Sequence, residues 1–286
     1  MDRLISLVRE HPRLFVLTGA GCSTDSGIPA YRDERGTWLG SQPVDHKAFM
    51  TDPHARCRYW ARSLVGWVHF QGAQPNECHH MLTDLQRAGF MERLVTQNVD
   101  GLHTRAGTRS VIDLHGRNDR VRCTACQRVY ARARFQAELT RRNPHIAAFQ
   151  AQPAPDGDAY LPPVDLSRFV IPSCPVCAGV LRPDVVFFGA AVPRPRVSLA
   201  YQALEKADAL LAIGTSLTVF SGFRFCRAAN ERNIPILLVN RGATRADDMA
   251  THKVALGCAL AMRTLVGELV PEDGKCRAGH TSETAN

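Results

Sequence analysis

The stretch Val16–Trp38 reads Val-Leu-Thr-Gly-Ala-Gly-Cys-Ser-Thr-Asp-Ser-Gly-Ile-Pro-Ala-Tyr-Arg-Asp-Glu-Arg-Gly-Thr-Trp. It begins in an apolar, partly β-branched run, residues 14–17, that stops at Gly19–Gly21, as a buried parallel strand does before a glycine turn. Glycines there remove Cβ atoms that would keep a pyrophosphate off the backbone. The hydroxyl residues that follow, Ser23, Thr24 and Ser26, predict N-caps of a short helix whose N–H groups face an anion. The stretch therefore predicts a phosphate-binding turn, with a purely topological glycine turn as the alternative.

The spacing of the glycines separates this turn from the dehydrogenase fingerprint. Gly27 comes too late for Gly-x-Gly-x-x-Gly, and the residues in between are small and polar. Residues 28–32, Ile-Pro-Ala-Tyr-Arg, predict a loop that closes over a ligand. The whole assembly, Gly-Ala-Gly-x-Ser-x-x-Ser-Gly-Ile-Pro-x-Tyr-Arg, resembles the first signature of the sirtuins, the NAD-dependent protein-lysine deacylases.

Length and composition are those of an ordinary globular protein. The 286 residues, 45% hydrophobic and 22% charged, can bury the core of one large domain or of one large and one smaller domain. No apolar run approaches the roughly 20 residues that span a bilayer, and residues 1–13 carry charges throughout, so we expect no membrane partner and a cytoplasmic location. The net charge of +8 is dispersed without aromatic interleaving. We expect a solvated basic surface that helps to dock acidic protein substrates, without specific nucleic-acid binding.

Four of the ten cysteines form two pairs, Cys123-Thr-Ala-Cys126 and Cys174-Pro-Val-Cys177. Two such knuckles, with 47 residues between them, supply the four thiolates that a tetrahedral zinc ion needs. With all four positions filled, no place remains for an activated water, so the zinc is expected to be structural. Two redox-active pairs are the alternative. The other cysteines are scattered singly, which favours a reducing compartment.

Apolar strands alternate with helices along the rest of the chain. Strands are expected at residues 94–96, 110–114, 181–189, 207–213, 236–239 and 253–256. Helices are expected at 45–70 with a break at 52–53, at 75–88, after the run 217–225 as far as 230, and after 258. This alternation predicts an α/β fold with a doubly wound parallel Rossmann-like sheet. We expect an NAD-binding domain that consists of residues 1–44, 76–116 and 181–270. We expect a small domain with two parts, a helical part of residues 45–75 and a zinc module of residues 117–180. Residues 271–286 are expected to form a tail.

The resemblance to sirtuins covers residues 14–270. Thr96–Gly107 match the second signature, Thr-Gln-Asn-Val-Asp-Gly-Leu-His-Thr-Arg-Ala-Gly. Residues 58–67, Arg-Tyr-Trp-Ala-Arg-Ser-Leu-Val-Gly-Trp, resemble the class II sirtuins, in which they help to wall the acyl pocket; simple core aromatics are the alternative. In residues 181–189, the family segment that pairs edge to edge with the substrate peptide is matched by Val186, Phe187, Phe188 and Gly189.

The resemblance also implies a reaction and its residues. An acyl-lysine carbonyl oxygen would attack the ribose carbon of NAD and expel nicotinamide, with His115 as general base on a ribose hydroxyl. Asn98 and Asp100 would hold the ribose and the carboxamide, and Arg32 would meet the phosphates. A structural histidine, helix caps and a surface charge are the alternatives for these four. The residues implied at NAD are Gly19, Ala20, Gly21, Ser23, Thr24, Gly27, Ile28, Tyr31, Arg32, Trp38, Gln97, Asn98, Asp100, His115, Gly214, Thr215, Ser216, Asn240, Arg241, Gly242 and Cys258.

Some positions depart from the family pattern. Ala30 replaces the acidic residue that commonly precedes the Tyr-Arg of the cofactor loop, and Ala190 replaces the acid that often follows the peptide-pairing segment. Tyr59 and Arg62 have the spacing of an acidic-acyl reader, yet their surroundings fit class II, so no succinyl or malonyl preference is expected. Protein ADP-ribosylation, a weakly catalytic NAD-sensing or chromatin-binding module, and a dehydrogenase are the rival functions.

Overall fold

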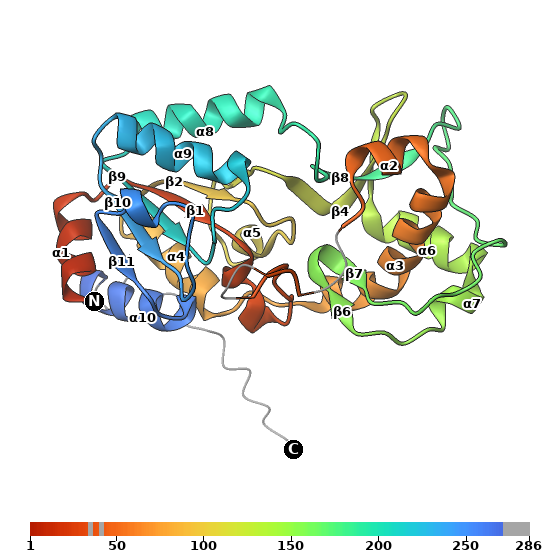
Figure 1. Cartoon of the computed structure of the whole chain (residues 1–286), viewed down its shortest axis with the longest axis horizontal. Helices are drawn as coiled ribbons and strands as arrows, with labels where there is room; N and C mark the ends of the chain where they lie inside the picture. The colour runs from red at the N-terminus through yellow and green to blue at the C-terminus, as the bar shows by residue number, and fades with distance from the viewer. Residues whose placement is uncertain (34–36, 40–42, 271–286) are drawn as a thin grey trace, which may run out of the picture.

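The structure, a computed structural model, describes residues 1–33, 37–39 and 43–270, and these form two lobes (Figure 1). The larger lobe is built on a six-stranded sheet in the order β11-β10-β9-β1-β2-β3, in which every pairing is parallel. The strands are β1 (Leu14–Thr18), β2 (Met91–Thr96), β3 (Ile112–Asp113), β9 (Ala209–Ile213), β10 (Ile236–Val239) and β11 (His252–Val254). The strand order reverses beside β1, the usual ligand site of such sheets. The predicted doubly wound sheet is confirmed.

Helices cover both faces of this sheet because its strands alternate between two apolar layers. Leu14 and Val16 of β1 pack with α1 (Asp2–Glu10), α4 (Glu77–Arg87) and α10 (Cys258–Leu269). Phe15 and Leu17 point the other way, toward α8 (Arg194–Lys206) and α9 (Phe220–Glu231). Figure 1 shows α8 and α9 along the upper side of this lobe. Both faces of β1 are therefore buried, as a continuous apolar run predicts.

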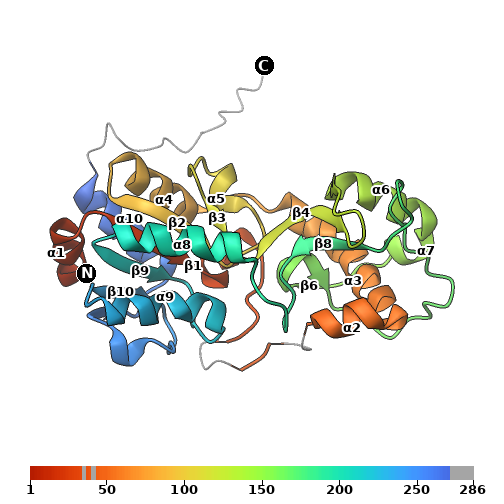
Figure 2. The same ribbon diagram turned by 90° about the horizontal axis from the view of Figure 1, so that it is seen from above.

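The smaller lobe lies beside the larger one, as both views show (Figure 2). It contains the helices α2 (His46–Thr51), α3 (Pro53–Gly72), α6 (Arg132–Arg142) and α7 (Pro144–Ala147). Its strands form a sheet of β5 (Val129–Ala131), β4 (Gly116–Cys123) and β8 (Leu181–Val185), in that order, and a hairpin of β6 (Pro153–Ala154) and β7 (Asp158–Ala159). The expected helix break at residues 52–53 separates α2 from α3. Trp60 and Trp67 of α3 are buried, which confirms them as core aromatics.

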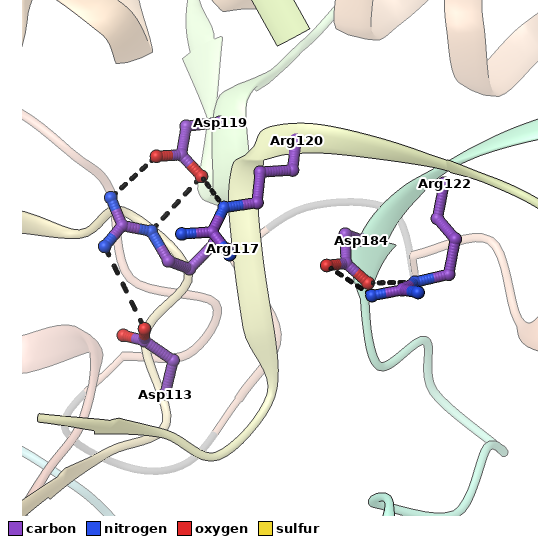
Figure 3. A network of polar contacts seen from close by, with 6 residues as sticks. All are labelled: Asp113, Arg117, Asp119, Arg120, Arg122 and Asp184. Atoms are coloured by element: carbon purple, nitrogen blue, oxygen red, sulfur yellow. Dashed lines mark hydrogen bonds and ion pairs between the residues drawn. The ribbon is translucent and has the colours of Figure 1, made fainter. Parts of the chain in front are cut away.

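The sequence analysis predicted none of the strands β4, β5, β6 and β7 of the smaller lobe. β4 (Gly116–Cys123) pairs antiparallel with β5 (Val129–Ala131) and with β8 (Leu181–Val185), so the strand expected within residues 181–189 continues the small-lobe sheet. Its half-buried positions carry charges that find partners: Arg117 contacts Asp113 and Asp119, and Arg122 contacts Asp184 across the sheet (Figure 3). Charged residues at these positions hide the strand from a hydrophobicity pattern.

Smaller differences concern the ends of elements. β3 has two residues rather than the five expected over 110–114, whereas β2 begins three residues before the expected 94. Helices α1 and α8, each with three or more buried residues, were not foreseen. The expected tail, residues 271–286, lies outside the described residues. None of the described helices combines the length and apolar composition that crossing a bilayer requires.

Candidate active site

The glycine turn after β1 packs against a second glycine turn after β9. A Cβ atom on Gly19 would lie 2.7 Å from Cβ of Thr215, and one on Gly21 would lie 2.9 Å from Cα of Gly214. The N–H of Gly21 donates to the carbonyl of Gly214 at 2.8 Å. The glycines thus allow two loops to meet at the carboxyl edge of the sheet.

The expected capping of a short helix by the hydroxyls of this stretch is wrong. Residues 20–26 form two 3₁₀ turns, Ala20–Cys22 and Thr24–Ser26, without side-chain caps. Ser23 instead donates to the carboxylate of Asp100 at 2.7 Å and accepts from Nδ2 of Asn98 at 3.0 Å. Tertiary partners outcompete local capping here because two polar side chains of the second signature reach the same hydroxyl.

Asn98 and Asp100 are brought together by that shared partner. Nδ2 of Asn98 also donates to the carbonyl of Gly19, and Asp100 accepts from the N–H of Leu102 at 2.8 Å. Burial raises the pKa of Asp100, although the hydrogen bonds from Leu102 and Ser23 oppose the shift. The three side chains form a network that ties the first signature to the second.

His115 follows β3 and presents one nitrogen to the cavity. Because a carbonyl only accepts, the contact of 2.9 Å to the oxygen of Gln97 fixes a proton on Nδ1. Nε2 lies 2.7 Å from Oγ of Ser221. Burial lowers the pKa of His115 to about 4, and the charges of Arg196 and Arg224 act in the same direction. The imidazole is therefore neutral at physiological pH, with Nε2 as its basic nitrogen.

Gln97 connects His115 to the second glycine turn. Its side-chain amide donates to Oγ1 of Thr215 at 2.9 Å, while its carbonyl holds His115. Asn240, Arg241 and Gly242 follow β10 at the same edge of the sheet, and Cys258 begins α10. Hydrogen bonds with Cys22 and Cys78 lower the pKa of Cys258. The carboxyl ends of β1, β2, β9 and β10 thus meet around one space.

That space is a cavity of about 700 Å³, within the range of small-molecule sites. The predicted residues that line it are Gly19, Ala20, Gly21, Thr24, Tyr31, Arg32, Trp38, Gln97, Asn98, His115, Val186, Phe187, Phe188, Gly189, Gly214, Thr215, Ser216, Asn240, Arg241, Gly242 and Cys258. Ser23, Gly27, Ile28 and Asp100 stand outside the lining. Ser221 and Arg224 also line the cavity, although the sequence analysis did not predict them. The position of Ser221 in the first turn of a helix, after the loop that ends a strand, was the signal that could have indicated it.

An aromatic cluster closes one side of the cavity. Tyr31, Trp38 and Phe188 meet edge to face, with ring centroids 5.6 to 6.0 Å apart. The guanidinium carbon of Arg32 lies 4.0 Å from the Trp38 ring centroid. Tyr31 and Trp38 therefore pack against Phe188, and these three rings form an aromatic wall of the cavity.

A smaller cavity, about 70 Å³, lies behind this wall and shares Tyr31, Trp38 and residues 185–188 with the large one. Tyr59 and Arg62 of α3 line it. Arg62 is paired with Asp158, which also lines the cavity, and both side chains are mostly buried. The positive charge of Arg62 is thus compensated inside the protein.

The four paired cysteines converge in the smaller lobe. Their sulfur atoms all lie within 4.8 Å of one another, with Cys123 and Cys177 3.5 Å apart and Cys126 and Cys174 3.7 Å apart. Tyr130 lies 3.1 Å from the Cys174 sulfur. Four converging thiols from two knuckles fit one tetrahedral zinc ion, and the site lies apart from the cavity residues.

Known proteins share these features. The model of the Sir2 family matches residues 19–221. An NAD-dependent protein deacetylase of Xanthomonas axonopodis pv. citri is 55% identical over 262 residues, which cover 92% of this chain and 89% of that relative.

Among solved structures, a Sir2 homolog–NAD complex has a TM-score of 0.71 at 30% identity and covers 94% of this chain, 93% of its own. A Sir2 variant with a deacetylated p53 peptide and 3′-O-acetyl-ADP-ribose has a TM-score of 0.77 at 27% identity and covers 95% of this chain, 99% of its own. The turn, the second signature, the histidine and the four-cysteine cluster occur together because this chain belongs to the Sir2 family, the sirtuins.

Proposed function

We propose that this protein is an NAD-dependent protein-lysine deacylase that transfers the acyl group from lysine to ADP-ribose and releases nicotinamide. The observation that carries the proposal is the neutral His115, whose basic Nε2 lies in the large cavity beside the two glycine turns. Relatives named NAD-dependent protein deacetylase, at 54 to 57% identity, support it.

His115 is proposed as the general base. NAD supplies the electrophilic ribose carbon and the nicotinamide leaving group. A neutral imidazole whose other nitrogen is fixed by the Gln97 carbonyl can accept a proton from a ribose hydroxyl without first losing one of its own. The low pKa of His115 in the free protein keeps this nitrogen available across the physiological range.

The polar residues around the base are proposed to orient NAD. Asn98 and Gln97 line the cavity, and Asp100 stands behind them, held by Ser23. We assign Asn98 and Asp100 to the ribose and carboxamide, which donor–acceptor side chains can read. The glycine turns and Arg32 are assigned to the phosphates, and Asn240, Arg241, Gly242 and Cys258 to the adenosine side.

The acyl-lysine peptide is proposed to bind along residues 186–189. Residues 186–188 of this segment line both cavities, so a lysine side chain passing Phe188 would bring its acyl group toward His115 and the smaller cavity. Because Asp158 compensates Arg62, the described residues that line this cavity offer an acidic acyl group no cation without a carboxylate partner. We therefore expect uncharged acyl groups, in agreement with a class II type.

The free cysteines among the described residues suit a cytoplasmic protein.

The larger lobe would then serve as the NAD-binding domain. The smaller lobe, chiefly residues 45–75 and 117–180, would complete the cleft and hold one structural zinc at Cys123, Cys126, Cys174 and Cys177. Thiolates at all four positions leave that ion no part in the reaction.

The test is mass spectrometry of acyl-lysine peptides incubated with and without NAD. We expect NAD-dependent loss of acetyl and other uncharged acyl groups, with O-acyl-ADP-ribose as product. His115→Ala should lower the rate at least about 100-fold, whereas His54→Ala, at an exposed position of α3, should retain it. ADP-ribose on added protein, or no turnover of any acyl peptide, would refute the deacylase function.

A further inference from the structure

The basic nitrogen of His115 has a hydroxyl partner that the proposed mechanism does not use. Nδ1 of His115 donates to the Gln97 carbonyl, so Nε2 can only accept while the ring is neutral. Oγ of Ser221 lies 2.7 Å from Nε2, the usual length of a strong hydrogen bond, and the hydroxyl must therefore donate.

The fold places this serine with little freedom. Ser221 is the second residue of α9, is 9% exposed and lines the large cavity. Its neighbour Gly222 lets the Gln97 side chain approach α9: a Cβ atom there would lie 2.6 Å from Oε1 of Gln97. Gln97 thus contacts α9 and holds His115, so both hydrogen bonds of the imidazole are built from one packed unit.

We propose that Ser221 is a positioning residue for the base: its hydroxyl aims Nε2 of His115 into the cavity and keeps that nitrogen unprotonated until the substrate hydroxyl replaces it. The inference rests on the proposed function of His115. A hydrogen bond donated to Nε2 can exist only in the neutral imidazole, so it stabilises the form that acts as a base.

Two arginines also act on the pKa of His115. Arg196 of α8 and Arg224 of α9 disfavour the imidazolium, as does burial, while the Gln97 carbonyl favours it. None of these groups changes when Ser221 loses its hydroxyl. The variant Ser221→Ala should therefore raise the pKa of His115 through the lost hydrogen bond alone.

The first experiment titrates ¹⁵N-labelled histidines by NMR, with His115 assigned from His115→Ala. Ser221→Ala should raise the pKa of His115 by roughly one unit, and Ser221→Thr, which keeps a hydroxyl, should restore it. Ser198→Ala, at an exposed position of α8, serves as the control. This measurement needs no turnover, so it stands even if no acyl peptide proves to be a substrate.

The second experiment measures the pH profile of kcat/KM with acetyl-lysine peptide. Ser221→Ala should lower kcat/KM roughly tenfold near neutral pH and move the acid limb upward by the same shift as the NMR titration. An unchanged or lowered pKa of His115, an unmoved acid limb, or a faster variant would overturn the inference. Deacylation that survives His115→Ala would instead overturn the proposed function, and the NMR result would tell the two failures apart.

Discussion

The two lobes of this protein are stabilised by different means. The larger lobe buries two apolar layers, one on each face of its parallel sheet. The core of the smaller lobe mixes aliphatic side chains with several aromatic rings, including Phe49, Trp60 and Phe135. Apolar burial grows with the size of a core, so a small lobe with short strands and long connections gains less of it. The difference explains why the four-cysteine cluster lies in the smaller lobe.

The smaller lobe also buries a charge. Arg132 is fully buried, and burial lowers its pKa to about 9. It donates to the carbonyl and hydroxyl of Ser63, and its guanidinium carbon lies 4.6 Å from the Trp67 ring centroid. Such contacts only partly offset the cost of desolvating a cation. A metal that crosslinks the lobe would supply the missing stability.

Removing the zinc site should produce the largest effect. We expect one zinc ion per chain, and Cys126→Ser should lose this ion. Because zinc binding contributes about 10 kcal/mol or more to folding in small metal-dependent folds, the smaller lobe should then unfold and deacylation should cease. Metal analysis, circular dichroism and limited proteolysis would measure these changes.

Cys226→Ser, at a buried cysteine of α9 in the larger lobe, is the matched control and should keep its zinc. A Cys126→Ser protein with a protease-resistant smaller lobe would show that its apolar core suffices, and the contrast between the lobes would then fail.

Closing the gap between the two glycine turns should have the next largest effect. Gly21→Ala places a Cβ atom 2.9 Å from backbone atoms of Gly214, so the turns must separate. We expect a loss of about 3 kcal/mol in stability and at least a tenfold weaker binding of NAD, measured by urea unfolding and calorimetry. Gly267→Ala in α10, where a Cβ atom meets nothing within 4 Å, should leave both unchanged or slightly improved. Equal behaviour of the two variants would contradict the packing argument.

Acidification should have a smaller effect, in which one residue of each lobe changes the stability of the protein in opposite directions. Burial lowers the pKa of His79 in the larger lobe to about 3, so its contribution to stability is complete above pH 6.5 and is lost as the pH falls toward 3. Burial raises the pKa of Asp158 in the smaller lobe to about 6, so its contribution is lost as the pH rises through 6.

Urea unfolding at pH 7.5 and 5.5 tests the histidine. Between pH 7.5 and 5.5 the free energy of unfolding of the wild type should fall by about 1.4 kcal/mol through His79. In His79→Gln the fall over the same range should be smaller by this amount. An identical pH dependence in both proteins would mean that His79 is not held neutral by the fold.

The predictions from sequence succeeded where a local pattern carries the information. The apolar run before Gly19 predicted β1, and the Cys-x-x-Cys pairs predicted a cluster that the structure brings together. They failed where partners are distant. β4 was missed because charged residues, Arg117 and Arg122, interrupt its apolar pattern. Their carboxylate partners include Asp113 and Asp184, which lie on other strands. The capping role predicted for Ser23 was wrong because its hydroxyl forms hydrogen bonds with Asn98 and Asp100 instead.

The sequence by itself determined the parallel sheet, the glycine turns and the identity of the family, because periodicity, backbone freedom and contiguous motifs are properties of neighbouring residues. Only the tertiary structure decided which nitrogen of His115 is basic and that Ser221 meets it, since 106 residues separate the two side chains. The pairing of Arg62 with Asp158 likewise depends on where α3 and β7 meet. Hydrogen bonds and charges between distant elements form only when packing brings their atoms within a few ångströms.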